Sequence, residues 1–480
     1  MLQQRQAKAT VLTTLGLAIV AALAHTSSGD GQVPETFAWD GRLLAAVKAR
    51  VLKGDVDLKP AVEALMHSAD SVVKADTSKL TVMAKNFTPP SGTKHDYMSV
   101  AIYYWPCNSP KFPPPFPKGC NTTTGLPWVS HDGVVDSEAV DKFDSVPLGK
   151  MQAAVTTLGL AAYMFDNETY AEHAMDISNQ WFLDPATRMN PNLNFAAFRP
   201  GINEGDASGI IGTVRWVHLV DAFQLLKMSK SFAEQLDLET WFGGYSAWLT
   251  DSKLGMGESH AKNNHGTWYD AQLQNYALYS RKPSVAKTVA QAAAAKRIDT
   301  QILPTGQMPL EEGRTKSWSY TDYNLQAFFN LATSALHSDV NLFTYVSSDG
   351  RSIRKAVEYI IPYMLGEKTW PYKQIEPFKY SSLFEVFRRS AIAFQNSTFE
   401  NIIEKVSNET LSNNVVNLLF PKAAIPGFDA MSTPVVLPGH DDDHYRHRNT
   451  QRRDDWVPDG YARLENGMIL PTAFLYKTPY

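Results

Sequence analysis

The sequence predicts a mainly helical fold, an incomplete α/α toroid in which antiparallel helix pairs form a ring and long loops line a groove. Three observations support this class: helical periodicity recurs in pairs, strand signals are sparse, and short turns alternate with long loops. No repeat of fixed period is visible, so an irregular helical solenoid is the structural alternative.

Helical periodicity begins near Trp39 and runs to Lys74 in two amphipathic segments, after which five helix pairs follow. We expect these pairs at residues 146–165 with 169–182, 211–227 with 236–249, the helix around His265 with 285–302, 318–336 with 353–365, and 380–395 with 399–411. Prolines and glycines interrupt the helical rhythm at 89–106 and 125–133, which predicts long irregular loops. Such loops are usually functional or disordered, and their many aromatic residues argue against disorder.

The 480-residue chain is 44% hydrophobic and 20% charged, with a formal net charge of −4. This composition is typical of a globular protein with enough apolar material for one large or two modest cores. The near-neutral balance argues against a nucleic-acid partner, because nucleic-acid binders show a basic face or stripe. A local basic groove for an acidic polymer is compatible with it, since net charge does not report patches.

The first 24 residues have the features of a secretory signal peptide. Arg5 and Lys8 form a positively charged start, residues 11–24 are apolar, and Ala22-Leu23-Ala24 offers small residues for cleavage. The apolar run is too short for a comfortable membrane span, so an uncleaved anchor is the less favoured alternative. We therefore expect a secreted, extracellular protein with no membrane contact after signal removal.

The rest of the chain divides into a flexible leader at 25–40, a helical domain at 41–425 and a charged C-terminal extension at 426–480. Five acceptor sequons for N-glycosylation support export, although such sequons also occur by chance. The sequon residues are Asn86, Asn121, Asn167, Asn396 and Asn408.

The only two cysteines, Cys107 and Cys120, flank a proline-rich loop. In an oxidising compartment we expect them to form one disulfide that staples this loop. Two thiols without clustered histidines make a poor zinc site. The run 440–456 carries three histidines among aspartates, but such charge blocks are usually solvated tails. We therefore expect neither a metal nor another cofactor.

Candidate binding residues gather first in the segment NNHGTWYDAQ. As a helix, this segment places His265, Trp268 and Tyr269 on one face. Asn263 and Asn264 add amide groups at its start, and helix-start N–H groups there favour a carboxylate. Aromatic side chains beside such donors suit a sugar ring with an acidic group. The alternative is an amide cap, a core histidine and core aromatic residues.

A second cluster lies where a Pro/Gly loop leads into the next helix. Arg314 is in the loop, and Tyr320 and Tyr323, three residues apart, share a face of the helix. A guanidinium that folds back onto a phenol lowers the phenol's pKa from about 10. The alternative is an arginine paired with Glu311 or Glu312 and tyrosines that merely pack.

These two segments, together with PPSGTKHDY, YYWP, GLPWVSHDG and LDPATRMNPNLNFA, resemble the alginate lyase superfamily, whose members include mannuronate and glucuronan lyases. The motifs run from Pro89 to Leu325 in the family's order, and the likeness extends to about Gln395. NNHGTWYD and RTKSWSY are specific, whereas the helix pattern by itself is not. The resemblance implies an α/α toroid that binds an acidic polysaccharide, such as alginate, mannuronan or glucuronan, and cleaves it by β-elimination.

In that reaction a proton next to a carboxylate is removed, so positioned donors must first neutralise the carboxylate. The resemblance assigns this neutralisation to Asn264, His265 and Arg314, and the roles of base and acid to Tyr320. Alignment on a later part of the motif favours Tyr323 instead. His265 is the alternative base where the two reacting groups lie on opposite faces of the sugar.

Further residues are predicted to bind sugar rings or hydroxyl groups, with loop scaffolding and local packing as the alternative. They are Asn263, Trp268, Tyr269 and Tyr323, Asn192 and Asn194 in the MNPNLNFA loop, and His95, Tyr97 and Trp105 in the aromatic loop. The segment INEGDAS, with Glu204 and Asp206, departs from the family pattern, because many relatives are more basic there. Extra negative charge would repel a polyuronate, which leaves the preferred uronan open.

Two other functions are compatible with the same segments. A glycoside hydrolase would use two carboxylates, drawn from Glu311, Glu312 and Asp132, that face the scissile bond. A non-catalytic binder of cell-wall polysaccharide would retain the polymer without shortening it. Only the lyase releases an unsaturated uronide, so the ultraviolet absorbance of the product separates a lyase from both alternatives.

Overall fold

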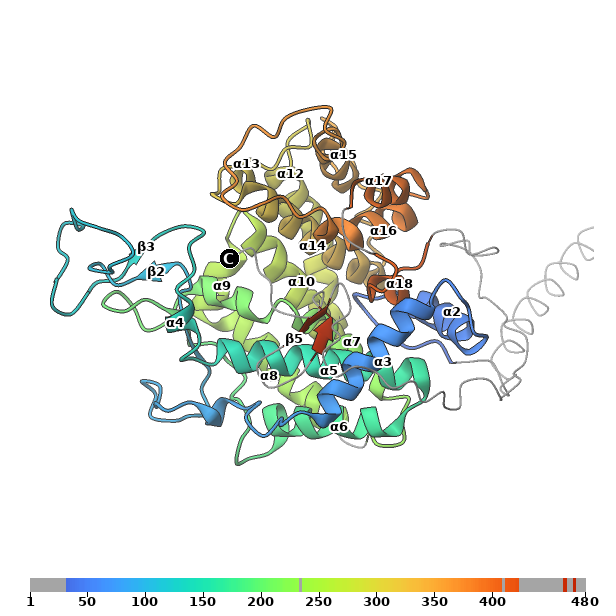
Figure 1. The fold of residues 1–480 in the computed structure, drawn as a ribbon, viewed down its shortest axis with the longest axis horizontal. Helices are drawn as coiled ribbons and strands as arrows, with labels where there is room; N and C mark the ends of the chain where they lie inside the picture. Colours follow the sequence, from blue (N-terminus) through green and yellow to red (C-terminus); the bar gives the residue numbers. More distant parts are fainter. Residues whose placement is uncertain (1–31, 233–234, 408–410, 423–460, 464–468, 472–480) are drawn as a thin grey trace, which may run out of the picture.

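The computed structural model describes residues 32–232, 235–407, 411–422, 461–463 and 469–471. Helices make up most of this part, and its strands are few and short, which confirms the predicted mainly helical class (Figure 1). The α-helices are α2 (Gly41–Leu52), α3 (Lys59–Lys74), α4 (Ser137–Val140), α5 (Ser145–Phe165), α6 (Glu168–Ser178), α7 (Trp216–Leu226), α8 (Gln235–Asp251), α9 (Lys253–Ser259), α10 (Asn264–Tyr279), α11 (Pro283–Ala293), α12 (Asp299–Gln301), α13 (Pro309–Glu312), α14 (Ser317–Ala335), α15 (Ile353–Met364), α16 (Phe384–Ala393), α17 (Thr398–Val406) and α18 (Val416–Leu419).

Five of these helices follow one another through the interior: α5 packs on α7, α7 on α10, α10 on α14, and α14 on α16. Four of these five helices also pack against the helix that follows them in the sequence. These pairs are α5 with α6, α10 with α11, α14 with α15, and α16 with α17. The fifth predicted pair, α7 with α8, meets through aromatic rings, with the Trp216 and Trp241 centroids 5.6 Å apart. The predicted helix pairs are therefore confirmed.

Burial separates the interior helices from their partners. α5 is buried at every position from Met151 to Met164, as expected for a helix that is apolar on all sides. α10 is also buried nearly throughout, and its polar side chains bond inside the protein; Gln272, for example, accepts a hydrogen bond from Thr213 at 2.7 Å. α15, by contrast, buries one stripe and leaves the other side toward solvent. Because the start of α10 is both polar and buried, its side chains need hydrogen-bond partners from neighbouring elements.

Short strands tie the long loops together. β1 (Met98–Val100) pairs in parallel with β4 (Phe195–Phe198), and β2 (Tyr104–Trp105) pairs antiparallel with β3 (Val129–Ser130). The sequence predicts irregular chain here, and it misses these strands because the partners are far apart along the chain. Cys107 and Cys120 form a disulfide in the loop between β2 and β3, as predicted.

The predicted flexible leader at 25–40 is wrong for its last part, since Phe37, Ala38 and Trp39 are buried in the core. The Asp221 carboxylate on α7 accepts hydrogen bonds from the backbone N–H groups of these residues at 2.6, 2.9 and 2.7 Å. The local sequence does not reveal this anchor, because Asp221 lies far along the chain.

The C-terminal extension contributes two described strands, β5 (Tyr461–Arg463) and β6 (Ile469–Pro471), which pair antiparallel. β6 packs against α3 and α5, so this part of the extension contacts the helical domain. The predicted signal peptide, the Asn408 sequon and the charged run at 440–456 lie outside the described residues. The other four sequon asparagines are exposed or half-buried, and their glycosylation stays a prediction.

Two kinds of feature are absent from the described residues. None of the helices in this part of the chain has the length and apolar character needed to span a membrane. Nor do the described His, Cys, Asp and Glu side chains gather in groups of three that could hold a metal ion.

Candidate active site

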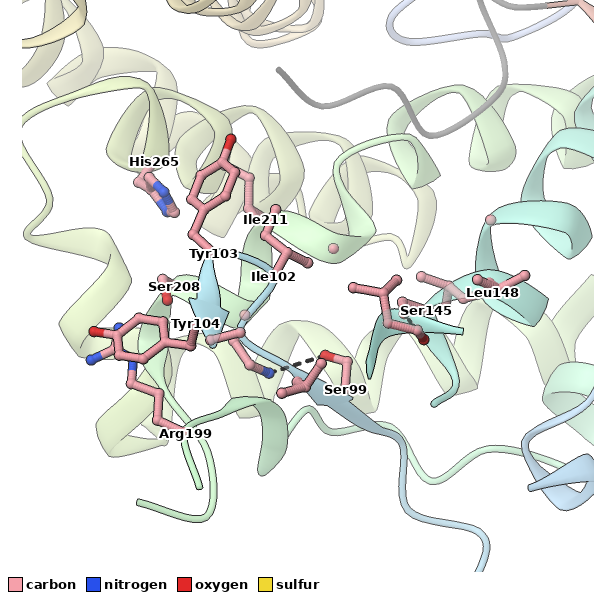
Figure 2. A pocket seen from close by; sticks show the side chains of 18 of the residues that line it. Ser99, Ile102, Tyr103, Tyr104, Ser145, Leu148, Arg199, Ser208, Ile211 and His265 are labelled. Atoms are coloured by element: carbon pink, nitrogen blue, oxygen red, sulfur yellow. Dashed lines mark hydrogen bonds between the residues drawn. The ribbon is translucent and has the colours of Figure 1, made fainter. Parts of the chain in front are cut away.

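A cavity of about 610 Å³ lies beside the start of α10. It is lined by β1 and the loop after it, the first turns of α5, the 3-10 segment η3 (Ala207–Thr213), α10 and α14. Figure 2 shows His265 and Tyr103 on one side of this space and Ser145 and Leu148 on the other. All four residues predicted to be catalytic line the cavity: Asn264, His265, Arg314 and Tyr320.

Asn264 begins α10 and is fully buried against Glu311 of α13. The Glu311 carboxylate accepts hydrogen bonds from the Asn264 backbone N–H at 2.5 Å and from its Nδ2 at 2.6 Å. Burial raises the pKa of Glu311 to about 7, although both donors lower it. The start of α10 thus meets a carboxylate, as expected, but the one bound by the Asn264 N–H group belongs to Glu311 of the protein itself. One hydrogen on Nδ2 is left for a ligand.

The glycine of the NNHG motif is required by close packing. A Cβ atom at Gly266 would overlap the Ala261 carbonyl oxygen and the Arg297 guanidinium. Arg297 is buried and donates to the Asp270 carboxylate on α10 and to the carbonyl oxygens of Ser259 and Ala261. The Arg297 side chain therefore fixes the turn that leads into α10.

The Gly266→Ala variant is expected to displace Arg297 and to lower the free energy of unfolding by about 1–3 kcal/mol, the usual range for overpacking. It is also expected to lower kcat/KM, because the displaced turn carries the start of α10. Gly243→Ala on α8 is the matched control: the nearest atoms to its added Cβ are 3.6 Å away, so it should be neutral or stabilising. Thermal unfolding checks both variants, and an unchanged Tm for Gly266→Ala would contradict the packing argument.

The His265 ring is held by Glu258 of α9, whose Oε1 lies 2.6 Å from Nδ1. Burial lowers the pKa of His265, but the charge and hydrogen bond of Glu258 outweigh it, so this pKa lies above its ordinary value. The side chain is 22% exposed and lines the cavity. Because Nδ1 is engaged, Nε2 is the nitrogen left for a ligand, and the protonated ring donates from it.

Arg314 folds back onto Tyr320, as predicted. Its Nη2 donates to the Tyr320 hydroxyl at 2.7 Å and to Asp132 Oδ1 at 2.5 Å. The guanidinium carbon lies 3.8 Å from the centroid of the Tyr320 ring. The Tyr320 hydroxyl also forms a hydrogen bond with that of Tyr103 at 2.8 Å. The acidic partner of Arg314 is thus Asp132 and not one of the two glutamates that precede it in sequence.

The acidity of Tyr320 differs from the sequence prediction. Burial raises the pKa of Tyr320 to about 12, while the Arg314 charge and the Tyr103 hydrogen bond lower it. The contribution of Arg314 therefore has the predicted sign, but the net shift is upward. The physical reason is that loss of hydration of the phenolate exceeds the attraction of a guanidinium that also pairs with Asp132.

Of the residues predicted to bind substrate, Tyr97 and Tyr323 line the cavity. Trp268 and Tyr269 do not; they are 0% and 4% exposed. The Trp268 ring packs 5.3 Å from that of Tyr323, and the Tyr269 hydroxyl donates to the Leu249 carbonyl oxygen. The substrate-binding prediction for these two residues is wrong, because the aromatic face of α10 points into the core.

The other predicted binding residues lie outside the cavity lining. They are His95, Trp105, Asn192, Asn194 and Asn263. Asn192 Nδ2 donates to Asp96 Oδ1 at 3.1 Å, and Trp105 Nε1 donates to the Val134 carbonyl oxygen at 2.9 Å. These hydrogen bonds hold the loops in place, which is the alternative role that the sequence analysis gave for these residues.

The acidic segment INEGDAS is less repulsive than its sequence suggests. Asp206 forms an ion pair with Arg199 at 2.9 Å, so its charge is compensated inside the protein. Glu204 is exposed and does not line the cavity. The segment therefore brings no uncompensated negative charge to the cavity lining.

Besides Asp132, three partners in the site escaped the sequence prediction: Tyr103, Glu258 and Glu311. Tyr103 is one of several aromatic residues in its loop and carries no local mark of its contact with Tyr320. Glu258 and Glu311 approach the start of α10 from α9 and α13. One signal could have indicated Glu258 and Glu311: polar residues that are buried at the start of a helix need hydrogen-bond partners from other elements.

Comparison with known proteins shows the family. A family model described as alginate lyase matches residues 81–370, a range that contains both the start of α10 and the Arg314–Tyr320 segment. The chain belongs to the alginate lyase family. The crystal structure of an alginate lyase from Bacteroides ovatus is 35% identical, has a TM-score of 0.74, and aligns over 81% of this chain and 99% of that chain.

A second solved structure is similar to this chain at lower sequence identity. The alginate lyase of a Sphingomonas species is 14% identical, with a TM-score of 0.50, and aligns over 82% of this chain and 99% of that chain, which shows a shared fold. A search of curated proteins finds no match. As a member of the alginate lyase family, the protein is a polysaccharide lyase.

Proposed function

We propose that the protein is a secreted polysaccharide lyase that cleaves a uronic acid polymer, such as alginate, mannuronan or glucuronan, by β-elimination. The observation that carries this proposal is the 2.7 Å contact between Arg314 Nη2 and the Tyr320 hydroxyl, in a cavity that Asn264 and His265 also line. Donors for a carboxylate and a phenol for proton transfer thus share one space. The signal-like start of the chain and the disulfide support secretion.

Each residue has a role that follows from its contacts. Arg314, His265 and the free Nδ2 hydrogen of Asn264 bind the substrate carboxylate and stabilise the charge that develops on it. The Tyr320 phenolate takes the proton from the carbon next to the carboxyl group. The bond to the glycosidic oxygen then breaks, a carbon–carbon double bond forms in the sugar, and the Tyr320 hydroxyl returns its proton to the leaving oxygen.

His265 acts as a donor in this proposal and not as the base. The Glu258 carboxylate favours the protonated ring, which donates to a carboxylate but takes no proton. Tyr320 is preferred over Tyr323 because its hydroxyl bonds to both Arg314 and Tyr103, and both contacts stabilise a phenolate.

The hydrolase alternative lacks the required pair of carboxylates. Among the described residues that line the cavity, Asp132 is the one with a carboxylate, and it pairs with Arg314. Glu311 is engaged with Asn264, and Glu312 lies outside the lining. An acid and a base that face one glycosidic bond, as hydrolysis needs, are therefore not in place.

The test is a panel of polyuronates incubated with the purified protein. The proposal expects the polymer to shorten and the ultraviolet absorbance of an unsaturated uronide to rise together, for at least one of alginate, mannuronan and glucuronan. New reducing ends without this absorbance would indicate a hydrolase. Retention on an immobilised polyuronate without chain shortening would indicate a binding protein.

The pKa of Tyr320 leads to a pH prediction. Because the phenolate is the reactive form and this pKa is about 12, kcat/KM is expected to rise as pH increases from neutrality, until His265 loses the proton that it donates to the substrate. Tyr103→Phe removes a hydrogen bond that lowers the pKa of Tyr320, so the rise should move to higher pH, with a rate about tenfold lower at a fixed pH. Tyr345→Phe, remote and bonded to Asp299, is the control. A profile that moves to lower pH in Tyr103→Phe would contradict this assignment.

A further inference from the structure

The wall of the cavity that α5 forms carries a basic residue with no assigned role. Lys150 of α5 is half-buried and lines the cavity together with Val146, Leu148 and Gly149 of the same helix. Figure 2 shows Ser145 and Leu148, which mark this α5 wall, separated from His265 and Tyr103 by the open space. The cavity therefore extends beyond the groups that take part in elimination.

Lys150 differs from the other basic residues of the cavity in its partners. Arg314 pairs with Asp132, and Arg199 pairs with Asp206 while its guanidinium lies over the Tyr104 ring. Lys150 has neither an ion pair nor a hydrogen bond with any residue of the described part of the chain. Three described Lys or Arg side chains line the cavity. Of these, Lys150 is the one whose charge is not compensated by a carboxylate of the described residues.

The surroundings of Lys150 favour an anionic ligand. Its neighbours on the α5 wall are apolar, and a charged group that loses water there is stabilised only when an opposite charge arrives. The C-terminal extension adds to this enclosure, because Ala462 of β5 lines the same cavity and β6, its paired strand, packs on α5. A carboxylate that reaches Lys150 would therefore bind in a partly desolvated place, where the attraction between opposite charges is stronger than in water.

We propose that Lys150 and the α5 wall form a second uronate subsite, which binds the carboxylate of a sugar other than the one that undergoes elimination. This inference rests on the proposed function. A uronan carries a carboxylate on every ring, so a chain held by Arg314 presents further carboxylates along the cavity. The substrate class that fits is a run of consecutive uronates, in preference to a polymer in which uronate alternates with a neutral sugar.

The test compares Lys150→Ala, Lys150→Gln and Lys150→Arg with the wild type on a mannuronan and on a polymer that alternates uronate with a neutral sugar. On mannuronan, Lys150→Ala and Lys150→Gln are expected to raise KM about tenfold with kcat within about twofold, since a charge-assisted contact is lost in the ground and transition states alike. Lys150→Arg should stay within about threefold of the wild-type KM, because it keeps the charge. The increase of KM with ionic strength should become weaker in Lys150→Ala.

Lys142→Ala is the matched control, because this lysine is exposed, lies just after α4 and is outside the cavity lining; its KM should not change. Binding of a mannuronate hexasaccharide is measured by calorimetry in the Tyr320→Phe background, with and without Lys150→Ala. An unchanged KM and Kd in Lys150→Ala would overturn the subsite, and so would a loss confined to kcat. If the wild type forms no unsaturated product but Lys150→Ala still weakens hexasaccharide binding, the lyase proposal fails and the subsite stands.

Discussion

The Tyr320→Phe variant is expected to have a kcat about a thousandfold below that of the wild type, within the range for losing a positioned proton-transfer group. The phenylalanine ring keeps the contact of the Arg314 guanidinium with the ring face, which lies at 3.8 Å in the wild type. It removes the oxygen that bonds to Arg314 and Tyr103. Because packing is retained, KM and Tm should change little, and initial rates from product absorbance measure the effect.

Tyr323→Phe is the control for this prediction. Tyr323 lines the same cavity, lies on the same helix and is similarly buried, but its ring packs against Trp268. We expect its kcat to stay within about tenfold of the wild type, since no proton transfer is lost. Abolished elimination in Tyr323→Phe with activity retained in Tyr320→Phe would reverse the assignment of the two tyrosines.

The Arg314→Ala variant is expected to have a kcat/KM about a thousandfold below that of the wild type. This is near the upper end of the rate losses that follow removal of one donor that stabilises the transition state. Two effects add: the substrate carboxylate loses a cation, and the Tyr320 phenolate loses the contribution that lowers its pKa. The remaining activity should therefore rise with pH over a higher range than in the wild type. Arg314→Lys keeps the charge but not the forked contact of Nε and Nη2 with the Asp132 carboxylate, which orients Nη2 toward the Tyr320 hydroxyl, so it should recover only part of the loss.

Arg281→Ala provides the control, because Arg281 is 52% exposed and pairs with the exposed Glu35 and with Glu239, which keeps Lys227 as a second partner. Its kcat/KM and Tm should match those of the wild type, since exposed ion pairs contribute about 0–1 kcal/mol. Arg314→Ala should also keep its Tm, because its partner Asp132 is 34% exposed and remains hydrated when the arginine is lost. Activity within a few fold of the wild type in Arg314→Ala would exclude the proposed neutralisation of the carboxylate.

Much of the fold could be predicted because each helix has a hydrophobic pattern within its own segment of the sequence. The helices α5, α10 and α14 carry long periodic or apolar segments, and their positions follow from that pattern. The disulfide could be predicted because the chain has only two cysteines. The pairing of β1 with β4 and the anchor of Phe37 to Asp221 could not, since both depend on segments that meet only after folding.

The candidate site divides in the same way. The resemblance of the motifs NNHG and RTKSWSY to the alginate lyase family singles out Asn264, His265, Arg314 and Tyr320, and these four side chains do line one cavity. The same motif was misleading for Trp268, because helical periodicity places residues on a face without saying whether that face meets solvent or the core.

By itself, the sequence determined the helical class, the order of the helix pairs, the disulfide and the four side chains that could serve an elimination. The helices and the disulfide depend on local periodicity and on residue types, and the four side chains on motifs that resemble those of the family; a chain carries all of these before it folds. Only the tertiary structure decided that Glu311 and Glu258 hold Asn264 and His265, that burial raises the pKa of Tyr320 despite Arg314, and that Lys150 lies in the cavity without a counter-charge among the described residues. Burial and charge compensation depend on which distant segments come into contact, and the sequence of one segment does not show which segments these are.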